Sequence, residues 1–430
     1  YIKKLIMQKS VFISIFLLLS STFIFSQKKS LDHTVYDSWK SLSNVKVSNN
    51  GKVVATLISP QEGDTALFIQ KVEGRNTKPG ESITVDRVRS YELSTDGRWT
   101  VGLLKAPFAD RRQARIDKKK KDVLPQDSLI IIDNLTFQIS KISSVKSYKT
   151  AVELNSHVAY TITTPKDTTD KNNAKQKDIL ILRNLLTHQE DSFKNAKEYI
   201  FNKYGNTLEN DLKTISNEQK EYKSLSFDEE GKQLVYLATS DTSKVDQKVY
   251  DLRYFISDSD TAVVLANEDA EGLPENWIFS ENSSPSFSKN GERILIGASP
   301  KKEPKDTTIV DFEMAQLDIW HWQDPIIQPQ QLVELRREEN RTYIGMILPE
   351  RANLFYPIAS EAMPYTTISD EGNGRFALLW SNLPYLLEGQ WDLSSKHDVK
   401  VMDLENMTIR EVGTPLNGRP TISPQGNYIY

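Results

Sequence analysis

Glycine-containing polar turns, each followed by an apolar run, recur along the chain. In each copy an apolar residue and a Ser or Asp precede the turn, a glycine closes it, and apolar residues dominate the next segment. Because glycine tolerates positive φ and such runs suit a pleated surface, each copy predicts a tight turn leading into a β-strand. The full copies are VSNNGKVVATLIS (47–59), LSTDGRWTVGLL (93–104), FDEEGKQLVYLAT (227–239), FSKNGERILIGAS (287–299) and ISDEGNGRFALLW (368–380).

A partial sixth copy, ISPQGNYIY, occupies residues 422–430. The glycines of successive copies lie 46, 134, 60, 81 and 54 residues apart, so the longest interval has room for one degenerate unit. We place that unit at VELNSHVAYTIT (152–163). The pattern therefore predicts six recognisable repeats and the start of a seventh.

A second signature, a strand, a polar turn and another strand, follows the glycine turns. Examples are DSLIIIDNLTFQISKI (127–142), DILILRNLLTHQEDSF (178–193), DLRYFISDSDTAVVL (251–265) and DVKVMDLENMTIREV (398–412). Four short strands per repeat, at a period of about 40 to 70 residues, are typical of β-propeller blades. We predict an all-β, incomplete β-propeller domain over 45–430; a β-sandwich or a row of small β domains is the alternative.

The N-terminus has the layout of a secretory signal peptide. Lys3, Lys4 and Lys9 precede the apolar segment VFISIFLLLSSTFIFS (11–26), and the charged QKKS comes directly after it. We expect a signal peptide over 1–26, with Met7 as the true start, and export to the periplasm or beyond. A retained membrane anchor is the alternative, although the run is short for a spanning helix. Residues 27–44 then form an N-terminal segment before the repeats.

Composition narrows the function classes. The 430 residues are 38% hydrophobic and 9% aromatic, enough for packed sheets, and the net charge of −4 gives no reason to expect a nucleic-acid partner. The chain has no cysteine, so we expect no disulfide and no lipid-attachment cysteine.

The signal peptide, the segment DHTVYDSWKSLSNVKVSNNGKVVATLISP (32–60) and the repeated turns resemble the N-terminal half of secreted bacterial serine peptidases of the prolyl oligopeptidase (S9) family. The resemblance implies a propeller that covers a C-terminal α/β-hydrolase domain carrying a Ser-Asp-His triad. The chain would then be the N-terminal fragment of an exported enzyme that hydrolyses short peptides, with the propeller gating access. It would need no cofactor and would not stay inserted in a membrane after signal cleavage. The alternative is a non-catalytic envelope propeller that binds proteins or glycans.

No catalytic residue can be assigned within the chain. The G-x-S-x-G motif that presents a hydrolase nucleophile does not occur, and the nearest string is GASP (297–300), in which we expect Ser299 to be a strand-end residue. The histidines are scattered and show no ligand spacing, so we expect no metal site and leave the substrate-binding residues unknown. They are His33, His157, His188, His321 and His397.

Three segments have two interpretations each. The basic run RRQARIDKKKKD (111–122) is typical of a solvated loop, and its alternative is a binding patch for an anionic partner. Glu338 and Glu339 lie in what we expect to be a solvated loop; the alternative is the glutamate pair with which dipeptidyl peptidases of the resembled family hold a substrate's amino terminus. Trp320 and Trp322 alternate along an expected strand, where packing between sheets is favoured over an aromatic ligand face.

Two weaker patterns lie along the same chain. The polar insertion at 203–223 predicts a short helix or extended loop at the rim of the propeller. Short Asp-Ser/Thr strings resemble an O-glycosylation signal of some exported bacterial proteins; they begin at Asp64, Asp127, Asp167, Asp260 and Asp306.

Overall fold

The computed structural model describes most of the chain from residue 36 onward. The described residues are 36, 39–73, 78–119, 124–153, 156–163, 178–194, 196, 198–203, 215–216, 220–241, 247–302, 319–392 and 394–430. The predicted signal peptide (1–26), most of the segment 27–44, most of the insertion 203–223, and Asp167 and Asp306 lie outside them. Contacts divide the chain into an N-terminal unit (1–93 and 100–143) and a C-terminal unit (94–99 and 144–430), and each is described by itself.

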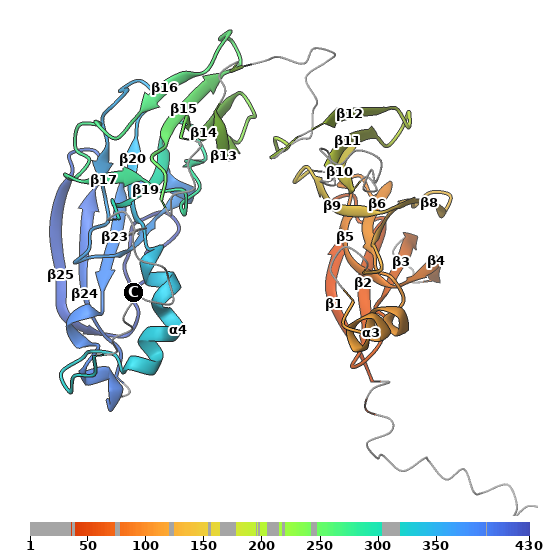
Figure 1. The fold of residues 1–430 in the computed structure, drawn as a ribbon, viewed down its shortest axis with the longest axis horizontal. Coiled ribbons are helices and arrows are strands. Elements are labelled where there is room, and N and C mark those ends of the chain that lie inside the picture. Colours follow the sequence, from red (N-terminus) through yellow and green to blue (C-terminus); the bar gives the residue numbers. More distant parts are fainter. Residues whose placement is uncertain are drawn as a thin grey trace, which may run out of the picture. The chain divides into compact units, whose positions relative to one another are not determined.

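The N-terminal unit contains two four-stranded antiparallel sheets, joined in chain order (Figure 1). The first comprises β1 (Lys40–Val47), β2 (Val53–Pro60), β3 (Ala66–Glu73) and β4 (Lys78–Asp86). The second comprises β5 (Val88–Leu93), β6 (Trp99–Leu104), β7 (Ser128–Asp133) and β8 (Gln138–Ser143). Helix α3 (Phe108–Ile116) lies in the connection between β6 and β7.

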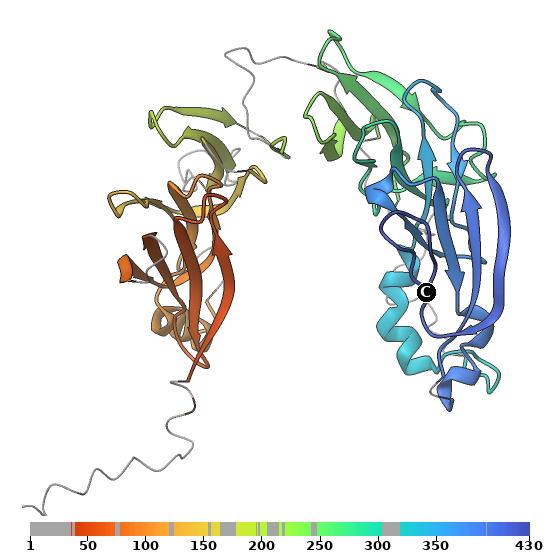
Figure 2. The same cartoon turned by 180° about the vertical axis from the view of Figure 1, so that it is seen from behind.

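The C-terminal unit carries four further antiparallel sheets (Figures 1 and 2). The first comprises β9 (Val145–Thr150), β10 (His157–Thr163), β11 (Asp178–Asn184) and β12 (Glu190–Lys194), and the second comprises β13 (Glu221–Phe227), β14 (Gln233–Thr239), β15 (Asp251–Ile256) and β16 (Val263–Ala266). The third comprises β17 (Trp277–Phe279), β18 (Ser286–Phe287), β19 (Ile294–Pro300), β20 (Tyr343–Ile347) and β21 (Tyr356–Pro357). The fourth comprises β22 (Tyr365–Ile368), β23 (Phe376–Ser381), β24 (Lys396–Asp403) and β25 (Thr408–Asn417). Helix α4 (Gln328–Glu339) and three short 3₁₀ helices, η3 (Asp370–Gly372), η4 (Leu383–Tyr385) and η5 (Glu388–Gln390), lie in the connections.

These sheets confirm the predicted fold class, an all-β chain of β-propeller blades. Each sheet follows its neighbour in sequence and consists of short antiparallel strands. Five of the sheets are meanders of four strands; in the sheet β17–β21, both β17 and β18 pair with β19. The degenerate unit at 152–163 supplies β10, and all four strand-turn-strand signatures form the strand pairs expected of them. After β25, residues 422 and 429 pair as an isolated antiparallel bridge around the last glycine turn.

The glycine turns share one geometry, which explains the repeated sequence. The closing glycine has φ between +69° and +91° in all six copies, a region that other residues enter at a cost. Its N–H donates to the carbonyl of the Ser or Asp three positions earlier, at 2.8 Å in both the Ser48–Gly51 and the Ser423–Gly426 turns. In the first turn the Ser48 hydroxyl also accepts a hydrogen bond from the Val53 N–H at 3.0 Å.

Within each unit, buried apolar clusters join neighbouring sheets. In the N-terminal unit, Leu67 and Ile69 of the first sheet pack with Val88 and Ile130 of the second. In the C-terminal unit one cluster joins the sheet β13–β16 to β17–β21, another joins β17–β21 to β22–β25, and a third places Ile422 against β23 and β24. Face-to-face packing of consecutive meanders is the arrangement of blades in a propeller.

Neighbouring turns of the C-terminal unit also contact each other. The half-buried Arg293 side chain, through Nη1, donates to the carbonyls of Gly372, Asn373 and Gly374 at 3.1, 3.1 and 2.7 Å. The Asp370 N–H donates to the Pro424 carbonyl at 2.8 Å. The turns at Gly291, Gly372 and Gly426 thus form one hydrogen-bonded series.

Candidate functional site

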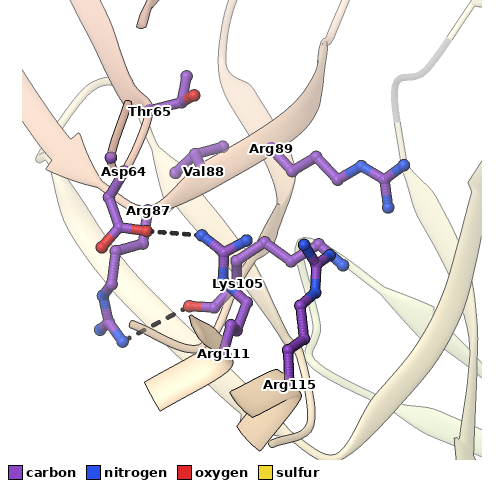
Figure 3. Close-up of a pocket in the computed structure, with 9 residues that line it drawn as sticks. Asp64, Thr65, Arg87, Val88, Arg89, Lys105, Arg111 and Arg115 are labelled. Atoms are coloured by element: carbon purple, nitrogen blue, oxygen red, sulfur yellow. Dashed lines mark hydrogen bonds and ion pairs between the residues drawn. The ribbon is translucent and has the colours of Figure 1, made fainter. Parts of the chain in front are cut away.

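A cationic pocket of 380 Å³ opens in the N-terminal unit, and we name it the arginine pocket (Figure 3). Among the described residues that line it, a single side chain is acidic. The lining residues are Gly63, Asp64, Thr65, Arg87, Val88, Arg89, Lys105, Arg111 and Arg115.

The sheet topology explains why these residues meet. In an antiparallel meander every second strand ends at the same edge. The turn with Asp64 follows β2, Arg87 is the single residue between β4 and β5, and Lys105 directly follows β6. The pocket therefore lies at the end of these sheets opposite the turn at Gly51, with α3 laid beside it.

Asp64 fixes helix α3 to the first sheet. One carboxylate oxygen accepts a hydrogen bond from the Phe108 N–H at 3.0 Å, at the first turn of the helix, where backbone N–H groups lack partners. The other pairs with the Arg111 guanidinium at 2.9 Å. Arg111 also donates through Nε to the Ala106 carbonyl at 2.8 Å. Both Asp64 oxygens are thus occupied by groups that position the helix.

Lys105 forms an ion pair, whereas Arg87 makes only one weak polar contact within the described part of the chain. The Lys105 ammonium pairs with Asp127 at 2.6 Å. Arg87 has φ of +69° in the link between the two sheets, and its guanidinium makes one long contact, 3.5 Å, to the Lys105 carbonyl.

Arg89 and Arg115 are exposed, and neither side chain forms an ion pair or hydrogen bond within the described part of the chain. Arg115 extends from α3 toward the strand that carries Val88 and Arg89 (Figure 3). Five cationic groups here face two carboxylates, Asp64 and Asp127. Such a pocket attracts anions and repels cations.

The basic run 111–122 supplies part of this pocket. Its expected loop conformation is wrong for the first six residues, because Arg111–Ile116 belong to α3, where Ala114 is buried against the unit. Residues 120–122 lie outside the described chain. Sequence reasoning missed Arg87, Arg89 and Lys105, because they stand apart along the chain and only the strand order brings them together.

Ser299 is a strand residue, as expected. It lies in β19, paired with Ile278 of β17, and is 7% exposed. A hydroxyl buried inside a sheet cannot approach a peptide carbonyl.

Glu338 and Glu339 end helix α4 rather than lying in a loop. Arg341 and Arg337 both pair with Glu338, at 2.6 and 3.2 Å. The hydrogen bond from Arg341 is the main cause that lowers the pKa of the Glu338 carboxyl. That carboxylate is already satisfied by arginines, which disfavours it as the receptor for a substrate amine.

Trp320 and Trp322 do not pack between sheets, so that prediction is wrong. They stand outside any strand, 67% and 82% exposed, in the segment that precedes α4. Gln390 ties this segment down by donating to the Pro325 carbonyl at 2.7 Å.

The described histidines occupy separate environments. His157 hydrogen-bonds Ser156 at 2.8 Å, and burial lowers its pKa; His397 is buried beside the Trp380 ring. No group of three His, Asp or Glu side chains suited to a metal occurs among the residues that the structure describes. Among the same residues, no helix is long and apolar enough to cross a bilayer.

No protein-family model matches the chain, and no curated protein matches it. Similar solved structures include a prolyl endopeptidase (10% identity, TM-score 0.40, covering 91% of this chain and 46% of the endopeptidase). The β-propeller domain of the Trilobed protease from Pyrococcus furiosus is also similar (10% identity, TM-score 0.34, 89% and 86% covered). So is a eukaryotic initiation factor (9% identity, TM-score 0.40, 90% of each chain covered). The chain spans less than half of the endopeptidase, and similarity at this level assigns it no activity.

Proposed function

We propose that the chain is the propeller part of an exported serine peptidase of the prolyl oligopeptidase family, and that the propeller restricts entry to short peptides. The observation that carries this proposal is the series of blades in combination with the signal-peptide pattern and the segment 32–60, which resembles this family. The nucleophile would lie in a hydrolase domain of the parent enzyme that follows the propeller. Peptide substrates would reach it past the propeller.

Labelling with a fluorophosphonate probe tests the proposal. The full-length gene product should label on one serine and hydrolyse short chromogenic peptides. Residues 27–430 alone should do neither, because no serine here stands in a nucleophile turn and Ser299 is buried. A labelled serine within 27–430 would contradict the assignment of chemistry to another domain.

The competing proposal is an exported propeller without catalysis that binds a protein or glycan. The exposed Trp320 and Trp322 favour it, because aromatic faces bind such ligands. The gene sequence beyond the codon for Tyr430 separates the two: a G-x-S-x-G motif supports the peptidase, and a stop codon within one repeat supports the binding protein.

A further inference from the structure

We propose that the arginine pocket binds a small oxyanion that carries at least two negative charges, either a phosphate compound or a polycarboxylate. This site is independent of the proposed peptidase activity and involves none of its residues.

The charge balance carries the first step. Asp64 and Asp127 neutralise Arg111 and Lys105, each at 2.9 Å or less. Among the described residues, Arg87, Arg89 and Arg115 then remain without a carboxylate partner around one pocket. Like charges held together repel one another, and a bound anion of charge two or more relieves that repulsion.

The types and origins of the side chains carry the second step. Arginine presents a planar fork of N–H donors that matches the oxygens of carboxylate and phosphate. Arg87, Arg89 and Arg115 come from a sheet-to-sheet link, strand β5 and helix α3, so their guanidinium groups lie on different sides of the pocket (Figure 3). The ion pair of Asp64 with Arg111 holds the helix in place without consuming these donors.

The size and lining of the pocket define the ligand. A volume of 380 Å³ is that of a small-molecule site. Val88 is the only apolar side chain in the described lining and is itself fully buried, so charged and polar side chains dominate the lining. The ligand is therefore compact and polar.

Isothermal titration of the full chain with inorganic pyrophosphate and, separately, with citrate tests the site. Arg89→Ala and Arg115→Ala should each weaken binding of the preferred probe by about tenfold, the loss expected when a charge-assisted hydrogen bond is removed. Both side chains are exposed and make no polar contact with other described residues, so the circular dichroism melting curves should stay unchanged.

Arg112→Ala is the matched control, because it removes the same charge from an exposed position of the same helix outside the pocket lining. Binding should be retained in this variant. Preference for pyrophosphate assigns the site to phosphate compounds, and preference for citrate assigns it to polycarboxylates. Absence of saturable binding of both probes, or an equal loss in all three variants, overturns the proposal.

Discussion

The hydroxyl of Tyr91, a residue of β5, forms hydrogen bonds with the first sheet and so connects the first two sheets. Its side chain is 1% exposed, and its hydroxyl lies 2.5 Å from the Asn44 carbonyl and 2.7 Å from the Ala55 carbonyl, to which it donates as a shared hydrogen bond. Asn44 sits at an irregularity of β1 with φ of +51°. The hydroxyl thus satisfies a carbonyl near the point where the strand ladder is interrupted.

Replacing Tyr91 with Phe should lower the free energy of unfolding by about 1 to 2 kcal/mol, because the carbonyl of the buried Ala55 loses a donor. Burial raises the Tyr91 pKa from 10.0 to about 12. A raised pKa favours the neutral phenol in the folded state. Its contribution is therefore complete below pH 10.0 and is lost as the pH rises toward about 12.

Urea unfolding at about pH 8 and at steps between about pH 10 and 12 measures both effects. The Phe variant should show the smaller loss of stability across the alkaline range. Tyr428→Phe, at a position 74% exposed, is the control and should behave as the parent chain. Identical curves for Tyr91→Phe and the parent would show that the hydroxyl holds no net stability.

At the scale of single elements, hydrogen bonds between the glycine turns connect neighbouring sheets of the C-terminal unit. The Arg293 guanidinium donates through Nη1 to three consecutive carbonyls of the turn at Gly372, so one cationic group satisfies acceptors of the neighbouring turn. Arg293→Ala should lower the free energy of unfolding by about 2 kcal/mol, the range of hydrogen bonds to charged donors. Amide exchange should speed up in residues 369–374 more than in the turn at Gly51.

Arg336→Ala removes an exposed arginine of α4 and is the matched control for Arg293→Ala. If both substitutions change stability and exchange equally, the contact of Arg293 with the next turn is not what orders that turn.

The strands were predictable from the sequence because the residues that determine each turn and strand are close together along the chain. A Ser or Asp, a glycine with positive φ and a following apolar run place turn and strand within about ten residues. Helix α3 was not predicted, although Pro107 stands where a helix often begins. Its first N–H is satisfied by Asp64, 44 residues earlier, and no local pattern shows such a contact.

Only part of the arginine pocket could be predicted from the sequence. The run at 111–122 indicated charge, and anion binding stood as its alternative interpretation. Arg87 and Arg89 flank a buried valine, so their local pattern is that of an ordinary strand start. Only the strand order places them beside α3, and strand order depends on packing between sheets.

At the scale of the whole molecule, the largest described clusters of the C-terminal unit each join two successive sheets of the series β13–β25, so the stability of this part should behave as a sum of neighbouring contacts. Ile296 of β19 is fully buried in the cluster shared with the sheet β13–β16. Ile296→Ala should cost about 2 to 5 kcal/mol through the cavity that it leaves. Hydrogen exchange should rise in β14, β15 and β19 while β2 and β3 keep their protection.

Val333→Ala, at a position 84% exposed on α4, is the control and should change stability by less than about 0.5 kcal/mol. Uniform loss of protection in every sheet after Ile296→Ala would mean that the blades unfold as one cooperative body.

The hydrogen-bonded series of turns also orders events in time. Arg293 finds its acceptors in the turn of Gly372, 81 residues later than the turn of Gly291, and the Asp370 N–H finds its acceptor in the turn after that. A ribosome adds about 5 to 20 residues per second, so Arg293 waits about 4 to 16 s for its partners. The turn that contains Arg293 thus lacks these acceptors until the next repeat has emerged, whether from a ribosome or across a membrane, and the length of that repeat sets how long a chaperone or protease can engage it.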